Sequence, residues 1–207
     1  MQLPRLFFIG LTVMIVCSTH QRVDGDEAPS VSKWRKHTIN DRSPFEAVGV
    51  ADFNGDEKLD VFSGDSWYAA PDWTRHKVRD VPVGTNPHYY EDFADVPLDV
   101  NGDGRVDIVT CAYFSRRISW VENPSDPTKP WPEHVIDTPG SMETGYGLDL
   151  FGDGTPVFLP NVGGQVGWYE LTSATPKVQW KPRKLAPDGA GHGVGHGDVN
   201  SDGRIDI

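Results

Sequence analysis

The sequence of 207 residues contains only two cysteines, Cys17 and Cys111. Removal of an N-terminal targeting segment, argued below, leaves Cys111 alone and excludes an intrachain disulfide. No long amphipathic helical pattern occurs, which argues against a helical fold. A phosphate-binding loop, a Ser-His-Asp pattern and a Cys/His zinc spacing are also absent, so these signals of a nucleotide-binding, hydrolytic or zinc protein are missing.

Basic residues are few, because 19 Lys and Arg stand against 30 Asp and Glu, for a net charge of −11. A surface this acidic repels phosphate backbones and anionic headgroups, so we expect neither nucleic acid nor an anionic membrane as a partner. Much of the negative charge lies in short Asp clusters, which indicates that the protein binds cations.

No apolar run is long enough to span a bilayer comfortably, so we expect no membrane span. Residues 1–25 have the features of a cleaved signal peptide: Arg5 supplies positive charge, residues 6–16 are an apolar run, and polar residues follow. We therefore expect a secreted, periplasmic or cell-surface domain over residues 26–207. Lipid attachment at Cys17 is disfavoured, because Val16 is large for the residue before a lipidated cysteine.

Glycine, proline and tryptophan are plentiful, with 22, 17 and 7 residues, and 37% of the chain is hydrophobic. This mixture favours a globular fold of many short strands joined by turns. It fits the absence of helical patterns.

An Asp-rich segment of nine residues recurs at 52–60, 99–107, 149–157 and 198–206, with starts separated by 47, 50 and 49 residues. A Trp-x-x-His or related motif recurs in step with it, at 34–37, 73–76, 131–134 and 180–183. One unit of roughly 49 residues explains both series, if eight residues are inserted around 83–95.

Each unit has room for about four short strands, which is typical of a propeller blade. We therefore predict an all-β fold, a β-propeller of four-stranded blades with about four repeats present, and we expect the Trp side chains to pack between blades. Because the chain stops one residue after the fourth Asp-rich segment, we also expect a truncated propeller that lacks further blades of the same chain.

The Asp-rich segments follow the pattern D-x-N-x-D-x-x-x-D, with oxygen-bearing side chains at positions 1, 3, 5 and 9. Such a loop suits Ca²⁺, and position 7 would add its main-chain carbonyl. A metal-free turn is the alternative, but its clustered carboxylates would repel one another. The predicted Ca²⁺ ligands are Asp52, Asn54, Asp56, Lys58 and Asp60; Asp99, Asn101, Asp103, Arg105 and Asp107; and Asp198, Asn200, Asp202, Arg204 and Asp206.

The four loops are unequal. The second and fourth are complete, whereas the first has Glu57 where glycine is preferred, so we expect it to bind more weakly. The third has Phe151 and Val157 at ligand positions, so we expect no well-bound ion there. An EF-hand is excluded, because it needs Glu at position 12, where Ser63 and Thr110 stand, and helices on both sides.

The loops, their spacing and the strand that follows each loop resemble FG-GAP/VCBS repeats of a secreted bacterial type, the family that includes the integrin α-subunit propeller. The resemblance covers about residues 31–207, and the Asp loops are its most specific part. It implies a closed propeller of about six to eight blades with Ca²⁺ bound at the hairpin loops. The third loop departs from the family motif.

The residues before each loop are predicted to form the innermost strand of a blade, which lines the central channel. Alternate residues of a strand share a face. Six positions before each loop stand Glu46, Phe93, Glu143 and His192, and two positions before stand Val50, Pro97, Gly147 and His196.

Two interpretations of these channel residues stay open. Glu46, Glu143, His192 and His196 are candidates for acid–base catalysis on a sugar, with tyrosines and carboxylates of the insertion nearby. In the second interpretation, which we favour, residues 191–197 form a glycine-rich inner strand without a catalytic role. We assign no catalytic residue.

The expected function is therefore that of a secreted, calcium-stabilised binding module for a protein or a polysaccharide. The alternative is a carbohydrate lyase or dehydratase, since the arrangement weakly resembles the fungal aldos-2-ulose dehydratase. That alternative rests on fold-level analogy.

Overall fold

The computed structural model describes residues 36–189 and 191–207. The predicted signal peptide at 1–25 lies outside these residues. The first two positions of the Trp-x-x-His motif at 34–37 lie outside them as well. The fold described below belongs to the compact unit Thr38–Ile207.

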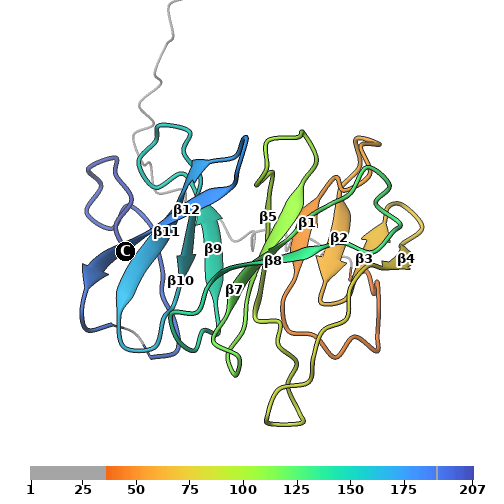
Figure 1. Ribbon diagram of the computed structural model, residues 1–207, viewed down its shortest axis with the longest axis horizontal. Helices are drawn as coiled ribbons and strands as arrows, with labels where there is room; N and C mark the ends of the chain where they lie inside the picture. The colour runs from red at the N-terminus through yellow and green to blue at the C-terminus, as the bar shows by residue number, and fades with distance from the viewer. Residues whose placement is uncertain (1–35, 190) are drawn as a thin grey trace, which may run out of the picture. The chain divides into compact units, whose positions relative to one another are not determined.

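The all-β prediction is confirmed: the described residues form three antiparallel four-stranded sheets and no helix (Figure 1). In each sheet the strands follow in sequence order. The first sheet comprises β1 (Gly49–Ala51), β2 (Asp60–Ser63), β3 (Ser66–Ala69) and β4 (Thr74–Lys77). The second comprises β5 (Ala94–Leu98), β6 (Asp107–Cys111), β7 (Ile118–Val121) and β8 (Glu133–Asp137). The third comprises β9 (Gly145–Leu148), β10 (Val157–Pro160), β11 (Val166–Ser173) and β12 (Gln179–Ala186).

Each of the first three Asp-rich loops joins the first strand of a sheet to its second, and all four loops share one backbone conformation. The residue at position 4 has positive φ in each loop (Gly55 77°, Gly102 72°, Gly152 70°, Ser201 64°). The residue at position 6 does as well (Glu57 66°, Gly104 85°, Gly154 82°, Gly203 83°). Glycine accounts for six of these eight positions because it has no Cβ to clash there.

Two hydrophobic clusters hold the three sheets side by side. Phe53, Phe62 and Trp67 of the first sheet pack against Ile108, Val121 and Trp131 of the second. The other cluster joins the second sheet to the third and contains Val109, Ile118, Trp120, Met142, Phe158 and Tyr169. The first strands β1, β5 and β9 also neighbour one another in that order. The closed propeller stays a prediction.

The tryptophans take different places. Trp67 and Trp131 are buried between the first two sheets, whereas Trp73 has positive φ (58°) and is only half-buried. The histidines of the Trp-x-x-His motifs stack across neighbouring strands: His76 on Trp67 and His134 on Trp120, each with ring centroids 4.5 Å apart. The motif thus supports sheet packing.

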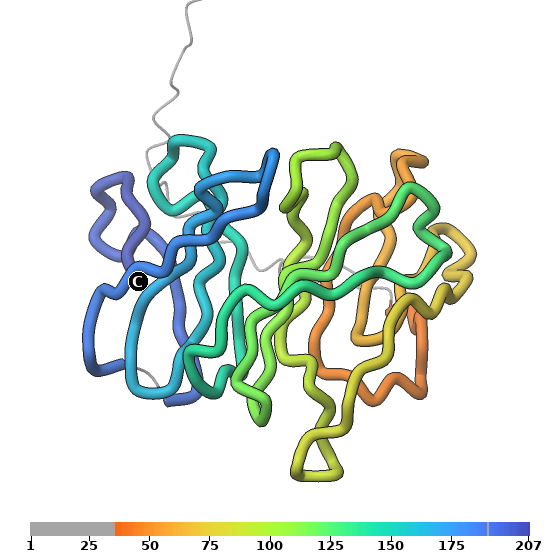
Figure 2. The backbone as a smooth tube through the Cα atoms, viewed as in Figure 1, coloured from red at the N-terminus to blue at the C-terminus, as the bar shows by residue number. Residues whose placement is uncertain are grey.

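The eight-residue insertion forms a long loop between β4 and β5 (Figure 2). The fourth Asp-rich loop, 198–206, is closed by the bridge between Gly197 and Asp206. The prediction of an inner strand at 191–197 is wrong, because apart from this bridge the segment pairs with no strand. Among the described residues, no helix is long and apolar enough to cross a membrane.

Candidate functional site

The four residues that stand six positions before the loops all line one pocket of about 480 Å³. Glu46 precedes β1, Phe93 precedes β5, Glu143 precedes β9, and His192 lies in the segment after the third sheet. Adjacent first strands bring these positions together from different sheets. The complete lining is Glu46, Asn86, Tyr89, Phe93, Tyr113, Phe114, Glu143, Thr144 and His192.

Glu143 and His192 form a hydrogen-bonded pair in this pocket. Nδ1 of His192 lies 2.9 Å from Oε2 of Glu143, although the residues are 49 positions apart. The imidazole is 79% exposed and the Glu143 side chain 32% exposed, so both remain accessible to a ligand. The pair can hold or transfer a proton at the pocket surface.

Asn161 directly follows β10 and forms hydrogen bonds with the backbone beside both Glu143 and His192. Its Oδ1 accepts the main-chain N–H groups of Glu143 and Thr144, at 2.8 and 2.7 Å. Its Nδ2 donates to the carbonyl of Gly191, at 3.5 Å. Asn161 is buried, with 2% of its surface exposed. It therefore ties the backbone beside Glu143 to the backbone beside His192.

An aromatic cluster forms the opposite part of the lining. Phe93 contacts Tyr89, Tyr113 and Phe114, with ring centroids 6.0 to 6.3 Å apart. Tyr89 and Phe93 come from the insertion, whereas Tyr113 and Phe114 follow β6. A Cβ on Gly84 would lie 2.3 Å from the Phe114 ring, so only glycine lets the insertion approach this closely.

Hydrogen bonds and ion pairs of carboxylates hold the insertion in place. Glu91 accepts the main-chain N–H groups of Phe114 and Ser115, at 3.2 and 2.9 Å. Farther inside, Arg79 donates to Asp92 at 2.5 Å and lies 3.6 Å from Asp95, and both aspartates are buried. Burial raises the pKa of Asp92 and of Asp95, and the charge of Asp92 raises the pKa of Asp95 further, whereas Arg79 opposes both shifts.

The fourth candidate of the sequence analysis, His196, does not line this pocket. Its ring packs edge-on against Tyr146 of β9, with centroids 5.0 Å apart. The inner-strand spacing therefore brings together Glu46, Glu143 and His192 and leaves His196 apart.

The Asp-rich loops are held by their own carboxylates. In the first loop, Asp52 Oδ1 accepts the N–H groups of Gly55 and Asp56, and Asp52 Oδ2 accepts that of Glu57 at 2.7 Å. Asp99 of the second loop has the same pattern, as it accepts the N–H groups of residues 102, 103 and 104. The position-1 carboxylate thus organises each turn.

The position-9 aspartates point into the sheets. Asp107 accepts the N–H groups of Val100 and Asn123, at 3.0 and 2.7 Å. Asp60 likewise accepts those of Phe53 and Ala70, at 3.1 and 2.8 Å. Both are fully buried, and burial raises the pKa of Asp107 to about 6. These carboxylates connect each loop to the strand pairs beside it.

The donors at positions 1, 3 and 5 fit Ca²⁺ in chemical type, since carboxylate and amide oxygens are hard ligands. The side chains at position 7 reach the position-5 carboxylates: Lys58 Nζ lies 3.0 Å from Asp56, and Arg105 pairs with Asp103. The five ligands predicted for each loop stay a prediction. Within residues 36–189 and 191–207, no three His, Cys, Asp or Glu side chains group closely enough to hold a metal.

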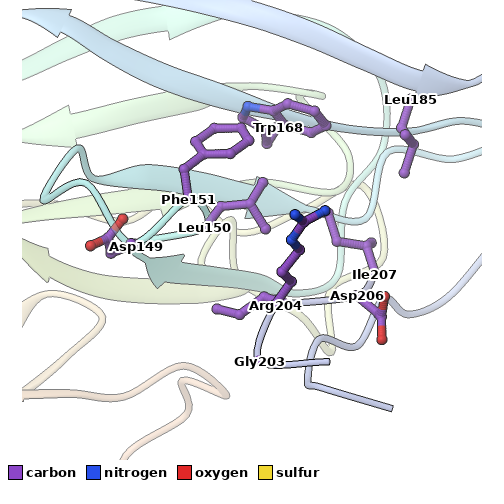
Figure 3. A pocket seen from close by; sticks show the side chains of 11 residues that line it. Asp149, Leu150, Phe151, Trp168, Leu185, Gly203, Arg204, Asp206 and Ile207 are labelled. Carbon is purple, nitrogen blue, oxygen red and sulfur yellow. The ribbon is translucent and has the colours of Figure 1, made fainter. Parts of the chain in front are cut away.

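A larger pocket of about 780 Å³ adjoins the third and fourth loops. Figure 3 shows Phe151 beside Trp168, with Arg204 reaching toward them from the fourth loop. Phe151, a departure from the metal motif, packs edge-on against the Trp168 ring at 5.8 Å. The equivalent space between the first and second sheets is filled by Ile108, Val121 and Trp131.

No protein-family model matches the sequence, and no curated protein matches it significantly.

Sequence reasoning missed several residues of the pocket. Tyr113, Phe114, Asn86 and Thr144 line it but were not singled out, and neither was Asn161, which bonds to the backbone beside it. The adjacent aromatic pair Tyr113-Phe114, directly after a β-prone stretch, was the available signal, because exposed aromatic residues in a loop often contact ligands. The sequence holds no comparable signal for Asn161.

Proposed function

We propose that this protein binds a saccharide in the pocket formed by Glu46, Phe93, Glu143 and His192. The observation that carries the proposal is the convergence of these four residues with an aromatic wall. Sugar rings have apolar C–H faces and polar edges, so they suit a site that offers both aromatic rings and carboxylates. A pocket of about 480 Å³ is also in the range of small-molecule sites.

The surrounding scaffold is, in this proposal, a secreted β-propeller of the FG-GAP/VCBS type, stabilised by Ca²⁺ at the Asp-rich loops. Three four-stranded sheets in sequence order, packed through interdigitating hydrophobic clusters, support a blade architecture. The shared positive-φ pattern of the four loops supports a common ion-binding role. The Asp, Asn, Lys and Arg positions given above for the first, second and fourth loops would hold the ion. Ca²⁺ would neutralise carboxylates that otherwise repel.

The test is titration calorimetry of the protein with four tetrasaccharides: cellotetraose, a β-1,4-glucosamine tetramer, its N-acetylated form and a uronic acid tetramer. We expect at least one to bind, and we expect Tyr89→Ala to weaken that binding about tenfold, since a stacked aromatic ring contributes about 1–3 kcal/mol.

Tyr146→Ala is the matched control, because the two side chains are equally accessible, 39% for Tyr89 and 38% for Tyr146, and Tyr146 does not line the pocket. We expect its affinity to equal that of the wild type. Absence of binding by every tetrasaccharide would refute the proposed function.

A second candidate function is an elimination reaction on a sugar, favoured by the 2.9 Å contact between His192 and Glu143. His192 would accept a proton from a carbon next to a carbonyl, and the electron pair of that C–H bond would form a C=C bond. The neighbouring C–O bond would break, and its oxygen would leave as water or alcohol after taking a proton from solvent. Glu143 would stabilise the imidazolium.

This candidate is tested by the ultraviolet absorbance of an unsaturated carbonyl product during incubation with keto-sugars. Wild-type protein should form the product, and His192→Ala should not. Product formation at equal rates by both proteins would dismiss the site, and no product from the wild type would leave binding as the function.

A further inference from the structure

We propose that the pocket selects saccharides that carry protonated amino groups, that is, amino sugars in their free-amine form. This inference rests on the proposed saccharide binding and names the ligand class. It follows from the charge of the lining, the exposed aromatic face and the position of the two glutamates.

The charge of the lining is negative. Of the nine lining residues, two are glutamates, Glu46 and Glu143, and none is Lys or Arg among the residues that the structure describes. The one basic side chain, His192, is already paired with Glu143. The two glutamates therefore outnumber the single basic side chain of the lining. A ligand ammonium group would be attracted to both.

The aromatic wall adds to this preference. Tyr89 lines the pocket and is 39% exposed, and its ring lies 6.2 Å from that of Phe93, so part of the aromatic surface is accessible. Aromatic faces attract cations through the ring quadrupole. They also stack on the apolar faces of sugar rings. An amino sugar offers both partners in one residue, an ammonium group and a C–H face.

The alternatives fit less well. A uronic acid would bring its carboxylate close to the carboxylates of Glu46 and Glu143, and these like charges would repel. The net charge of the protein, −11, adds to this repulsion. A neutral or N-acetylated sugar could stack on Tyr89. It would, however, displace water from the two carboxylates without supplying a positive charge in return. The free amine is the form that compensates this loss.

The decisive comparison is between the β-1,4-glucosamine tetramer and its N-acetylated form, which share every ring and differ in charge. We expect the free-amine tetramer to bind at least tenfold more tightly. The difference should shrink as salt screens the attraction and as rising pH deprotonates the amines.

Glu46→Gln should reduce the affinity ratio between the two tetramers several-fold, because it removes one carboxylate from an exposed position where the fold does not depend on it. Asp72→Asn is the control: Asp72 is exposed and lies outside the pocket, so the ratio should stay as in the wild type.

The outcomes separate this inference from the proposed function. Equal or tighter binding of the N-acetylated or uronic tetramer would overturn the amino-sugar inference while leaving saccharide binding intact. An unchanged ratio in Glu46→Gln would overturn it as well. Binding of no tetramer would overturn both.

Discussion

At the scale of single residues, Glu57 has a left-handed backbone conformation, which Ser201 shares at another loop position. Glu57 is a non-glycine residue with φ of 66°, at the position where the other three loops have glycine. A left-handed conformation costs a residue with a Cβ about 1–2 kcal/mol. Glycine would keep the bond from the residue-57 N–H to Asp52, which is a main-chain contact.

We therefore predict that Glu57→Gly stabilises the protein by about 1 kcal/mol, less than the full strain because glycine also gains freedom in the unfolded chain. Thermal denaturation should show a rise of about 2–4 °C in the melting temperature.

Gly104→Ala is the reciprocal control at the same position of the second loop. Its φ is 85°, and an added Cβ would meet nothing within 4 Å, so the change tests backbone conformation alone. It should lower the melting temperature by a similar amount. A fall in both variants would contradict the strain argument.

The buried pair Asp92 and Asp95 makes stability depend on pH. Asp92 Oδ2 and Asp95 Oδ1 have no hydrogen-bond partner in the described structure, and a single Arg79 serves both carboxylates. Because folding raises the pKa of Asp95, the folded protein binds its proton more tightly than the unfolded chain does. The free energy of unfolding must therefore fall as pH rises from the ordinary Asp range through the raised pKa.

Asp95→Asn should reduce this dependence without abolishing it, because burial also raises the pKa of Asp92 and of Asp107. The new amide can donate to Asp92, while its oxygen still accepts the N–H of Gly64, now accepted by Asp95 at 3.1 Å. We expect a gain of about 1–3 kcal/mol at neutral pH, the cost of a buried polar group without a partner. Urea denaturation across a pH series measures it.

Asp188→Asn, at an exposed carboxylate, should leave the pH profile of the wild type unchanged. If Asp95→Asn were less stable than the wild type at neutral pH, the charge of Asp95 would be required and this account would be wrong.

At the scale of elements, Asn161 connects β10 to two segments that carry pocket residues. Asn161→Ala leaves the buried N–H groups of Glu143 and Thr144 without their acceptor and frees the segment at Gly191. We predict a loss of about 1–3 kcal/mol in stability. We also predict at least a tenfold loss of affinity for the glucosamine tetramer, measured by calorimetry, because Glu143 and His192 lose their relative position.

Asn123→Ala separates positioning from stability. Asn123 is equally buried and donates to the carbonyls of Phe53 and Val106, at 2.9 and 3.1 Å, away from the pocket. It should lose similar stability but keep the wild-type affinity. Equal loss of affinity in both variants would show that Asn161 acts only through stability.

Sequence spacing was sufficient to predict an all-β fold of four-stranded sheets and to find Glu46, Phe93, Glu143 and His192, because a regular unit places equivalent residues at equivalent depths. It could not predict that His196 contacts Tyr146 instead of the pocket, since that depends on the path of residues 191–197. It also could not show that Asp60 and Asp107 accept main-chain N–H groups from two segments each. Those donors come from neighbouring turns and strands.

At the scale of the whole molecule, the position-9 aspartates connect ion binding to sheet packing. Asp107 accepts the N–H of Asn123, and the Asn123 side chain donates to the carbonyl of Phe53 in the first loop. An ion that orders the second loop would thus also order the boundary between the first and second sheets. Loop occupancy should therefore change the stability of the whole unit rather than of one turn.

We predict that Ca²⁺ at about one hundred times its dissociation constant adds about 2.7 kcal/mol to the free energy of unfolding for each loop that it occupies, and that excess EDTA removes this gain. For a protein of this size, each occupied loop should raise the melting temperature by about 5–10 °C. Asp103→Asn, in the complete second loop, should reduce the calcium-dependent rise. Asp153→Asn should not, because Phe151 and Val157 replace two ligands of the third loop. A melting curve that is identical with Ca²⁺ and with EDTA would show that the loop carboxylates are held by main-chain N–H groups and basic side chains alone.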